Sequence, residues 1–439
     1  MEFSKNISLV TTNHLCTGCG ACKVICPHRA IYMHKTNMGR LFADIDMELC
    51  TDCSVCIEIC PGFDKSGYVI TPDYNHNPFE GIVKNTYTGI STNKLVYENA
   101  QSGGLVTECL SYLFDEKRID AAIVCVSNYG EDRPFVSAMV ATEKRQLLLS
   151  QRSSYTPIDM VSALEHTGSY EKVAFVGLPC HIQGVMSLQK KYKKFKNIIY
   201  KFGLICDRSL SETIVDMFIP KNDKTKKNKI YWRYKYGYIY RNAPVVIENE
   251  CGVKKMIPSV KRHLLKDYFT SPRCRICFDK MNIHSDITFG DPWGMGNIDW
   301  QNGNSLVITR TDEGENLIQN LMHERRVKLN ITSFEEVRQG QGLGKRKSQI
   351  KTFCEIYRKN NWLLPNYVNQ LDLSVMSGLP NGQYENLIKN YLNLEVQDRN
   401  SIVKEIQKQY CNKIIQNKIK TFIRMPFRML NKIIKSMQI

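Results

Sequence analysis

Apolar and polar positions follow different periods in different parts of the chain, and each period predicts an element. Residues 30–50 alternate like a short hairpin with its turn at residues 37–39. Apolar residues at helical spacing predict a helix over residues 105–114, and the apolar run of residues 119–126 predicts a buried strand. A small hairpin therefore precedes the beginning of a larger fold.

Strands and helices continue to alternate in the middle of the chain. Residues 173–176 predict a strand, residues 177–180 a turn and residues 181–192 a helix, and the next predicted strand carries Cys206 at its C-terminal end. Such alternation is typical of an α/β domain with an at least partly parallel sheet. Ligands bind such sheets at the carboxyl ends of the strands, where Cys180 and Cys206 both fall.

Other stretches predict irregular or antiparallel structure. Residues 231–250 alternate aromatic and polar side chains, which suits base stacking on RNA but fits a half-buried antiparallel hairpin better. Residues 221–229 and 338–345 are interpreted as loops, the latter because its glycines lack the Walker phosphate-loop spacing. The Pro-, Asn- and Tyr-rich residues 71–87 are interpreted as a linker.

The C-terminal residues 399–439 predict a basic amphipathic helix with a kink at Pro426. They contain ten Lys or Arg and a single acid, Glu405. Apolar residues recur at three- to four-residue spacing: Ile415, Ile419, Phe422, Ile423, Phe427, Leu430, Ile434 and Met437. We expect this stripe to contact an anionic membrane surface or an acidic partner, or else to pack against the rest of the protein.

Composition narrows the class of protein. The 439 residues carry a formal net charge of +17, and the C-terminal segment holds over half of that excess, which argues against nucleic-acid binding. No apolar run reaches the roughly 18 residues of a membrane span, and residues 1–16 lack a signal-peptide core. We therefore expect a cytoplasmic protein whose 17 cysteines are ligands rather than disulfides.

The first sixty residues contain one cysteine pattern twice, a C-x2-C-x2-C-x3-C run followed by Pro. In bacterial-type two-cluster ferredoxins, three thiolates of each run bind one 4Fe-4S cluster and the fourth binds the other. This pattern assigns Cys16, Cys19, Cys22 and Cys60 to one cluster, and Cys50, Cys53, Cys56 and Cys26 to its neighbour. Zinc sites prefer two separated C-x2-C pairs, so zinc or a disulfide knot is the weaker reading.

Four further cysteines accompany the predicted α/β elements: Cys180, Cys206, Cys274 and Cys277. Four thiolates suffice for a third cluster, although a buried cysteine pair or half of a zinc ribbon is the alternative for the last two. The remaining five lie singly and are interpreted as packing residues: Cys109, Cys125, Cys251, Cys354 and Cys411. Glycines in the loop of residues 101–104 suit a close ligand approach at a helix start, and a purely structural role is equally open.

The order of these motifs, over residues 10–325, resembles the beta subunit of coenzyme F-420 hydrogenase/dehydrogenase with a fused N-terminal ferredoxin. Family members bind FAD beside a 4Fe-4S cluster and move electrons between a two-electron carrier and iron–sulfur centres. The resemblance implies that the four further cysteines ligate the flavin-side cluster. It also implies a flavin site lined by Ser102, Gly103, Gly104 and Thr107. Asp207-Arg208 and His181 depart from the common family residues at their positions.

The predicted fold class is α+β or α/β. A small two-cluster ferredoxin-like domain (residues 1–80) precedes an α/β flavin- and cluster-binding domain in two parts (81–165, and 166–330 with the third cluster). A helical basic extension follows (331–439).

The resemblance implies an FAD- and 4Fe-4S-dependent oxidoreductase that uses deazaflavin F-420 or a similar carrier, with a redox partner protein or small electron carrier. The alternative is an electron-transfer subunit without a substrate site, serving a partner enzyme in surface-polysaccharide biosynthesis. No catalytic triad, paired carboxylates or C-x3-C-x2-C radical motif competes with these readings.

Overall fold

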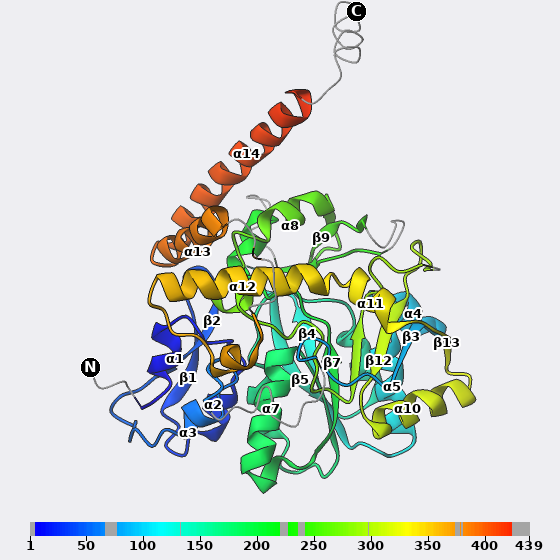
Figure 1. Ribbon diagram of the computed structural model, residues 1–439. Coiled ribbons are helices and arrows are strands. Elements are labelled where there is room, and N and C mark those ends of the chain that lie inside the picture. Colours follow the sequence, from blue (N-terminus) through cyan, green and yellow to red (C-terminus); the bar gives the residue numbers. More distant parts are fainter. Residues whose placement is uncertain are drawn as a thin grey trace, which may run out of the picture.

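An eight-stranded mixed sheet forms the centre of this computed structural model (Figure 1). The structure describes residues 5–65, 77–131, 133–219, 227–235, 242–296, 298–373, 378 and 381–423. The strand order is β13-β3-β12-β11-β7-β6-β4-β5. The strands are β3 (Asn85–Ser91), β4 (Ala121–Asn128), β5 (Phe135–Ala141), β6 (Val173–Gly177), β7 (Ile198–Leu204), β11 (Ile287–Gly290), β12 (Ser305–Thr309) and β13 (Val327–Ile331).

The middle of this sheet is parallel and its two sides are antiparallel. Strand β7 pairs in parallel with β6 and β11, and β6 pairs in parallel with β4. The flanking pairs β4–β5, β11–β12, β12–β3 and β13–β3 are antiparallel. The predicted α/β fold with a partly parallel sheet is therefore confirmed.

Helices cover both faces of the sheet because alternate strand residues point to opposite faces. Ala122 and Val124 of β4 pack with α5 (Leu105–Asp115) and α10 (Asp312–His323), whereas Ala121 and Ile123 pack with α7 and the 3-10 helix η1. Here α7 spans Pro179–Lys191 and η1 spans Met160–His166, and three smaller helices complete the layers: α4 (Lys94–Asn99), α6 (Lys144–Leu149) and η2 (Lys193–Phe195).

The N-terminal cysteine runs form a small module beside this sheet (Figure 1). Its elements are α1 (Ser8–Thr12), α2 (Ala21–Ile25), β1 (Ile31–Lys35), β2 (Leu41–Ile45) and α3 (Val55–Glu58). β1 and β2 form the predicted antiparallel hairpin, with Ile31 opposite Ile45 and Lys35 opposite Leu41. Its turn docks on the larger domain, where the amide of Glu212 donates to the Gly39 carbonyl at 2.9 Å.

A second, three-stranded antiparallel sheet is formed by residues 228–257 of the larger domain. It contains β8 (Asn228–Tyr231), β9 (Val245–Asn249) and β10 (Lys254–Ile257), accompanied by η3 (Glu212–Met217), α8 (Ser259–Leu265) and α9 (Pro272–Arg275). Of the hairpin predicted for residues 231–250, β9 is present and Tyr231 at the end of β8 pairs with Val246, but residues 232–235 are not a strand and residues 236–241 lie outside the described residues. Trp232 is 1% exposed and packs edge-on against Tyr155, so this aromatic residue belongs to the core rather than to a stacking surface.

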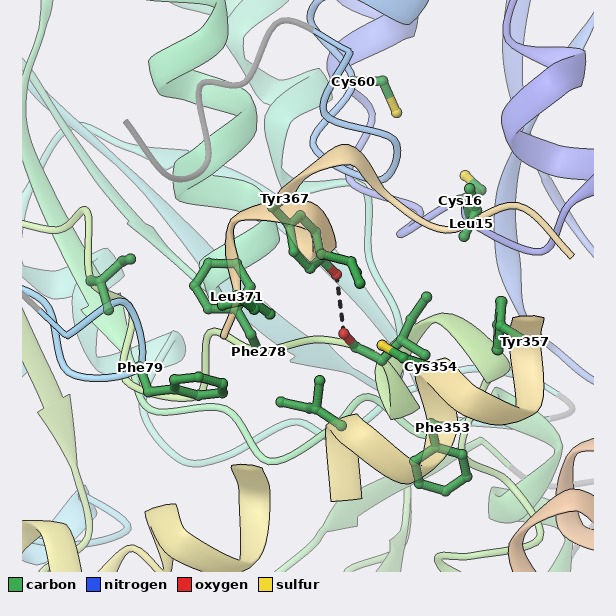
Figure 2. Close-up of a cluster of buried hydrophobic side chains, with 14 of the residues drawn as sticks. Leu15, Cys16, Cys60, Phe79, Phe278, Phe353, Cys354, Tyr357, Tyr367 and Leu371 are labelled. Carbon is green, nitrogen blue, oxygen red and sulfur yellow. Dashed lines mark hydrogen bonds between the residues drawn. The ribbon is translucent and has the colours of Figure 1, made fainter. Parts of the chain in front are cut away.

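The C-terminal extension packs across the module and the larger domain. Its helices are α11 (Phe334–Gly340), α12 (Leu343–Lys359), η6 (Asn366–Gln370), α13 (Asn381–Glu395) and α14 (Arg399–Ile423). Figure 2 shows the shared hydrophobic cluster, which joins Leu15 of the module, Phe278 of the larger domain, and Phe353 and Tyr367 of the extension. The Tyr367 hydroxyl donates to the Ile276 carbonyl at 3.1 Å.

Polar contacts also fasten the module to the extension. Arg40 Nε donates to Glu395 Oε1 at 2.7 Å and Nη2 to Oε2 at 3.1 Å, and the two side chains are 9% and 10% exposed. The Asn366 amide donates to the Phe63 carbonyl at 3.0 Å. The module, the larger domain and the extension therefore share one interior.

Three loop or linker predictions are wrong at particular residues. The predicted linker of residues 71–87 ends too late, because β3 begins at Asn85 and pairs with β12 and β13; residues 71–76 lie outside the described residues. Residues 228 and 229 belong to β8 rather than to a loop. Residues 338–345 join two helices, and a Cβ on Gly340 would lie 1.8 Å from the Trp293 carbonyl oxygen, so this junction is tightly packed.

The predicted C-terminal amphipathic helix is helical as far as the structure describes it. α14 ends at Ile423, so Pro426 and its predicted kink lie outside the described residues. Ile402 and Ile406 are fully buried, whereas Ile415 is 54% exposed. Figure 1 shows α14 running away from the body of the molecule. None of the described helices is long and apolar enough to cross a membrane.

Candidate metal and cofactor sites

The inner thiol group consists of Cys16, Cys19, Cys22 and Cys60, each at most 7% exposed. Burial, followed by the neighbouring thiols of Cys16, Cys19, Cys60 and Cys56, raises the pKa of Cys22 well above its ordinary value. The amides of Gly18 and Ala43 both donate to Cys16 Sγ at 3.4 Å. Such N–H···S contacts stabilise negative charge on sulfur and tune the potential of an iron–sulfur centre.

The outer thiol group lies at the surface of the module. Cys26, Cys50, Cys53 and Cys56 line one hollow of about 320 Å³ that is open to solvent. Cys53 is exposed, and the amides of Ala30 and Asp52 donate to the sulfurs of Cys26 and Cys50 at 3.3 and 3.4 Å. The structure therefore brings together the same two sets of four that the sequence pattern predicts.

The third thiol group forms where the central strands end. Cys180 follows β6 in the first turn of α7, Cys206 follows β7, and Cys274 and Cys277 lie in and just after α9. Burial raises the pKa of Cys180 most, followed by the thiols of Cys19, Cys206, Cys277 and Cys274. The four thiols therefore lie near one another, with Cys180 and Cys206 at the strand ends as predicted, and Cys19 of the inner group lies beside them.

The inner and third groups meet where α2 packs against α7. A Cβ built on Gly184 of α7 would lie 3.3 Å from the Ala21 Cβ and 3.6 Å from Cys19 Sγ. The outer group is next to the inner one, since the Cys56 thiol also raises the pKa of Cys22. The three groups therefore follow one another in the order outer, inner, third; the inner thiols are buried, whereas the thiols of the third group are partly exposed.

The 17 cysteines all carry free thiols, and none forms a disulfide. Among the described residues, no three His, Cys, Asp or Glu side chains converge tightly enough to hold a single metal ion. A 4Fe-4S cube makes a different demand, because each of its four irons takes its own thiolate at a separate corner.

Buried arginines surround the third thiol group. Arg273, Arg275 and Arg346 are 3%, 5% and 5% exposed, and each has a buried guanidinium nitrogen without a hydrogen-bond partner among the described residues. Burying unpaired cations is costly unless negative charge compensates them. A cluster held by four thiolates is an anion, so the donor set and its surrounding charge fit a 4Fe-4S cluster.

The extension supplies one of these arginines. Arg346, on α12, donates from Nη2 to the Cys274 carbonyl at 3.3 Å. Burial raises the pKa of Cys277 most, whereas the nearby guanidinium groups of Arg273 and Arg346 lower it. Nothing in the sequence around Arg346 indicates this role, because its position depends on packing between segments about seventy residues apart.

The two unusual positions have structural explanations. Arg208 bridges Asp207 and Asp267, with Nε–Oδ2 and Nη1–Oδ1 distances of 2.8 and 2.9 Å. His181 Nδ1 accepts a hydrogen bond from the Leu178 amide at 3.2 Å and so caps the beginning of α7. Burial lowers the pKa of His181 to about 4, which keeps the imidazole neutral.

A basic hollow lies beside the loop that precedes α5. Its lining residues are Ala100, Gln101, Arg152, Arg233, Tyr234 and Lys235, and its space of about 190 Å³ is open to solvent. The side-chain amide nitrogen of Gln101 (Nε2) is buried and has no hydrogen-bond partner among the described residues. Burial lowers the pKa of Lys235 to about 8, and the hollow is suited to an anionic group.

The predicted flavin residues lie next to this hollow rather than lining it. Lys235 Nζ donates to the Ser102 carbonyl at 3.1 Å. Gly103 has a packing role, because a Cβ there would lie 2.2 Å from the Gly89 carbonyl oxygen and 2.7 Å from the Ser305 amide nitrogen. Thr107 is 6% exposed, and Gly104 begins α5 with a φ of +78°. Their contact with a flavin stays a prediction.

Comparison with known families identifies the larger domain. Sequence models of the N-terminal and C-terminal parts of the coenzyme F-420 hydrogenase/dehydrogenase beta subunit match residues 86–165 and 170–333. The chain belongs to this family. A 4Fe-4S dicluster domain model matches residues 15–62, so the first eight cysteines belong to a two-cluster module.

Named relatives of this beta-subunit family share moderate similarity with the chain. A coenzyme F-420-dependent sulfite reductase of Methanocaldococcus jannaschii is 29% identical over 287 residues, which cover 60% of this chain but only 40% of that protein. A coenzyme F-420 hydrogenase subunit beta of Methanococcus voltae is 28% identical over 291 residues, covering 62% of this chain and 92% of the relative. These relatives are oxidoreductases or their subunits.

A solved structure supports the fold of the beta-subunit family. A chain of the F-420-reducing [NiFe] hydrogenase complex from Methanosarcina barkeri superposes with a TM-score of 0.50 at 19% identity, covering 70% of this chain and 99% of that chain. The family match ends at residue 333, so α11 to α14 are additions of this chain relative to the matched region. Arg346 belongs to that added part.

Proposed function

We propose that the chain is an iron–sulfur flavoprotein oxidoreductase that connects a two-electron carrier, deazaflavin F-420 or a similar compound, to single-electron acceptors. When bound, FAD splits an electron pair and 4Fe-4S clusters carry single electrons. The observation that carries this proposal is the row of three thiol groups, which ends beside three buried arginines, each with a guanidinium nitrogen that has no hydrogen-bond partner among the described residues. The family relatives named above support the oxidoreductase class.

The twelve cysteines of the three groups are the proposed cluster ligands. The inner and outer groups would hold the two clusters of the dicluster module, and the third group would hold one more. The chain's own residues position the sulfurs of the third group at the ends of β6, β7 and α9, bury the sulfurs of the inner group, and supply cations beside the third.

Iron and sulfide analysis tests the ligand assignment on the full-length chain purified without oxygen. We expect roughly twelve of each per chain. Cys277→Ser should remove about a third of the iron, whereas Cys251→Ser, at an exposed cysteine far from these motifs in sequence, should remove none. Roughly eight irons in the unaltered protein would refute the third cluster.

The basic hollow is the proposed anchor for the anionic part of the flavin or of the two-electron carrier. Arg152, Arg233 and Lys235 offer positive charge, and Gln101 offers an unused amide donor. The hollow is smaller than pockets that enclose whole cofactors, so only part of an anionic cofactor could contact it. The isoalloxazine would lie nearer to Ser102, Gly103, Gly104 and Thr107, as the family resemblance implies.

Flavin content tests this anchor. Lys235→Ala should lower the FAD bound per chain, because it removes a cation from the hollow. Arg145→Ala changes an exposed arginine on α6, with its side chain 87% exposed, and serves as the control that leaves FAD unchanged. Equal FAD in both variants, or FAD-free protein that still turns over, would contradict the site.

The alternative is an electron-transfer subunit that serves a partner protein. The exposed outer group favours a protein partner, because Cys53 is accessible at the surface of the molecule. Anaerobic turnover separates the two readings: reduced F-420, nicotinamide and ferredoxin are each offered with a viologen dye as acceptor. If the isolated chain oxidises a two-electron donor, the enzyme hypothesis is supported. If a chain with its full iron content but no FAD oxidises none of the donors, the electron-transfer subunit hypothesis is supported.

A role in surface-polysaccharide biosynthesis stays a prediction. Analysis of the surface glycans of a deletion strain checks it.

The end of α14 is the proposed contact with an anionic membrane. Its beginning is fixed to the body, since Arg399 Nε donates to Asp216 Oδ2 at 2.5 Å and Ile402 and Ile406 are buried. A chain shortened after Tyr410 therefore keeps the packed turns and removes the basic remainder. Full-length protein should sediment with anionic liposomes at low salt and the shortened chain should not. Equal sedimentation of both would refute the contact.

A further inference from the structure

We propose that Arg273 is a shared counter-cation that sets the reduction potentials of both the inner and the third cluster. The inference rests on the proposed three-cluster function and adds a residue that acts on two sites at once. Its charge affects the reduction potentials of both clusters. Arg273 is a positioning residue and does not itself carry electrons.

Arg273 lies between the two thiol groups. On one side, Nε donates to the Gly62 carbonyl at 3.2 Å and Nη2 to the Pro61 carbonyl at 3.3 Å. These carbonyls follow Cys60, the inner ligand contributed by the second cysteine run. On the other side, Arg273 directly precedes Cys274 in α9. The residue therefore belongs to one ligand loop, and its side chain reaches the other.

The Arg273 guanidinium is buried without an ion pair to a carboxylate of the described residues. The residue is 3% exposed, and its Nη1 has no hydrogen-bond partner in that part of the chain. By contrast, buried Arg40 pairs with Glu395 and Arg208 pairs with Asp207. The guanidinium lies 5.4 Å from the centre of the Tyr367 ring, which holds it in place from the extension.

A buried cation acts strongly on redox equilibria because the surrounding dielectric is low. One electron passes between the two sites without forming or breaking a bond, and each reduction adds a negative charge near Arg273. Its positive charge favours the reduced form at either site. Removing it should therefore make reduction of both centres harder, whereas a cation near only one site should affect that site alone.

Arg346 provides the matched control. It is equally buried, at 5% exposed, and donates to the Cys274 carbonyl, but none of its hydrogen bonds reaches residues 60–62. Arg273→Met should lower the potentials of the inner and third clusters together. Arg346→Met should lower that of the third cluster and leave the inner one unchanged.

The experiment is an anaerobic redox titration of full-length protein followed by electron paramagnetic resonance. The resonance signal that disappears in Cys277→Ser is assigned to the third cluster. The signal that changes in Cys53→Ser is assigned to the outer cluster. We expect Arg273→Met to weaken reduction roughly tenfold at each of the two sites, a shift of about 59 mV for one electron. Iron content is measured on the same samples.

Each outcome decides a separate question. A shift at the third cluster alone, or at neither, in iron-replete Arg273→Met overturns the shared role. Absence of a third signal in the unaltered protein overturns the three-cluster function instead. If Arg273→Met does not accumulate, Arg273→Gln replaces it, because glutamine removes the charge but keeps an amide donor for the carbonyls. Both potentials should then fall, and an unchanged inner potential in iron-replete protein overturns the proposal.

Discussion

The ion pair between Arg40 and Glu395 should control how readily the N-terminal module detaches from the rest of the protein. Glu395→Ala leaves the Arg40 guanidinium buried without its carboxylate. Both side chains are at most 10% exposed and meet through two hydrogen bonds. Removing one partner of a buried pair costs about 3–5 kcal/mol.

This cost predicts a measurable change in local opening. Because about 1.4 kcal/mol is tenfold in an equilibrium constant, local opening of the module should become at least roughly a hundredfold more frequent. Amide hydrogen exchange of β1 and β2, measured anaerobically by mass spectrometry, reports this opening. The hairpin amides should exchange faster by about that factor.

Two controls make the prediction refutable. The double variant Arg40→Met/Glu395→Leu replaces the pair with apolar groups and should exchange nearly as slowly as the unaltered protein. Glu98→Ala breaks the exposed pair with Lys94, whose side chains are 56% and 87% exposed, and should have almost no effect. Unchanged exchange in Glu395→Ala would show that the extension does not hold the module.

Three other changes follow from the same contacts. Gly103→Val should destabilise the protein and lower its melting temperature even without flavin, because the new Cβ would meet the Gly89 carbonyl; normal melting would contradict that packing. Anion affinity of the basic hollow should fall as pH rises through about 8, where Lys235 loses its charge, and Lys235→Arg should abolish this dependence in a phosphate titration. Phe278→Ala should cost about 3–5 kcal/mol, because its ring packs 4.8 Å from Tyr367; a denaturation midpoint equal to that of the unaltered protein would refute this.

Local patterns predicted the elements that depend on neighbours in sequence. The helix at 105–114, the strands at 119–126 and 173–176 and the hairpin at 30–50 correspond to α5, β4, β6 and β1–β2. The cysteine spacing also predicted which thiols meet within the module. These features depend on periodicity and on short loops, which the sequence records directly.

Features that depend on distant segments were not predictable. The beginning of β3 was interpreted as part of a Tyr- and Pro-rich linker. The strand is stabilised by pairing with β12 and β13, which lie over 200 residues away in sequence. Arg346 and Arg152 carry no local signal, since each reaches its site from another part of the chain. Arg273 precedes Cys274, and that adjacency was the one sequence clue to a cation at the third thiol group.

The pairing of Arg40 with Glu395 also has a consequence for biosynthesis. The partners are 355 residues apart, so a ribosome that adds about 5–20 residues per second needs roughly 20–70 s to make the second after the first. During that interval the module's thiols have emerged, but the helices that close over them do not yet exist. Iron can therefore reach these thiols before the nascent chain is complete. Oxygen can damage them during the same interval.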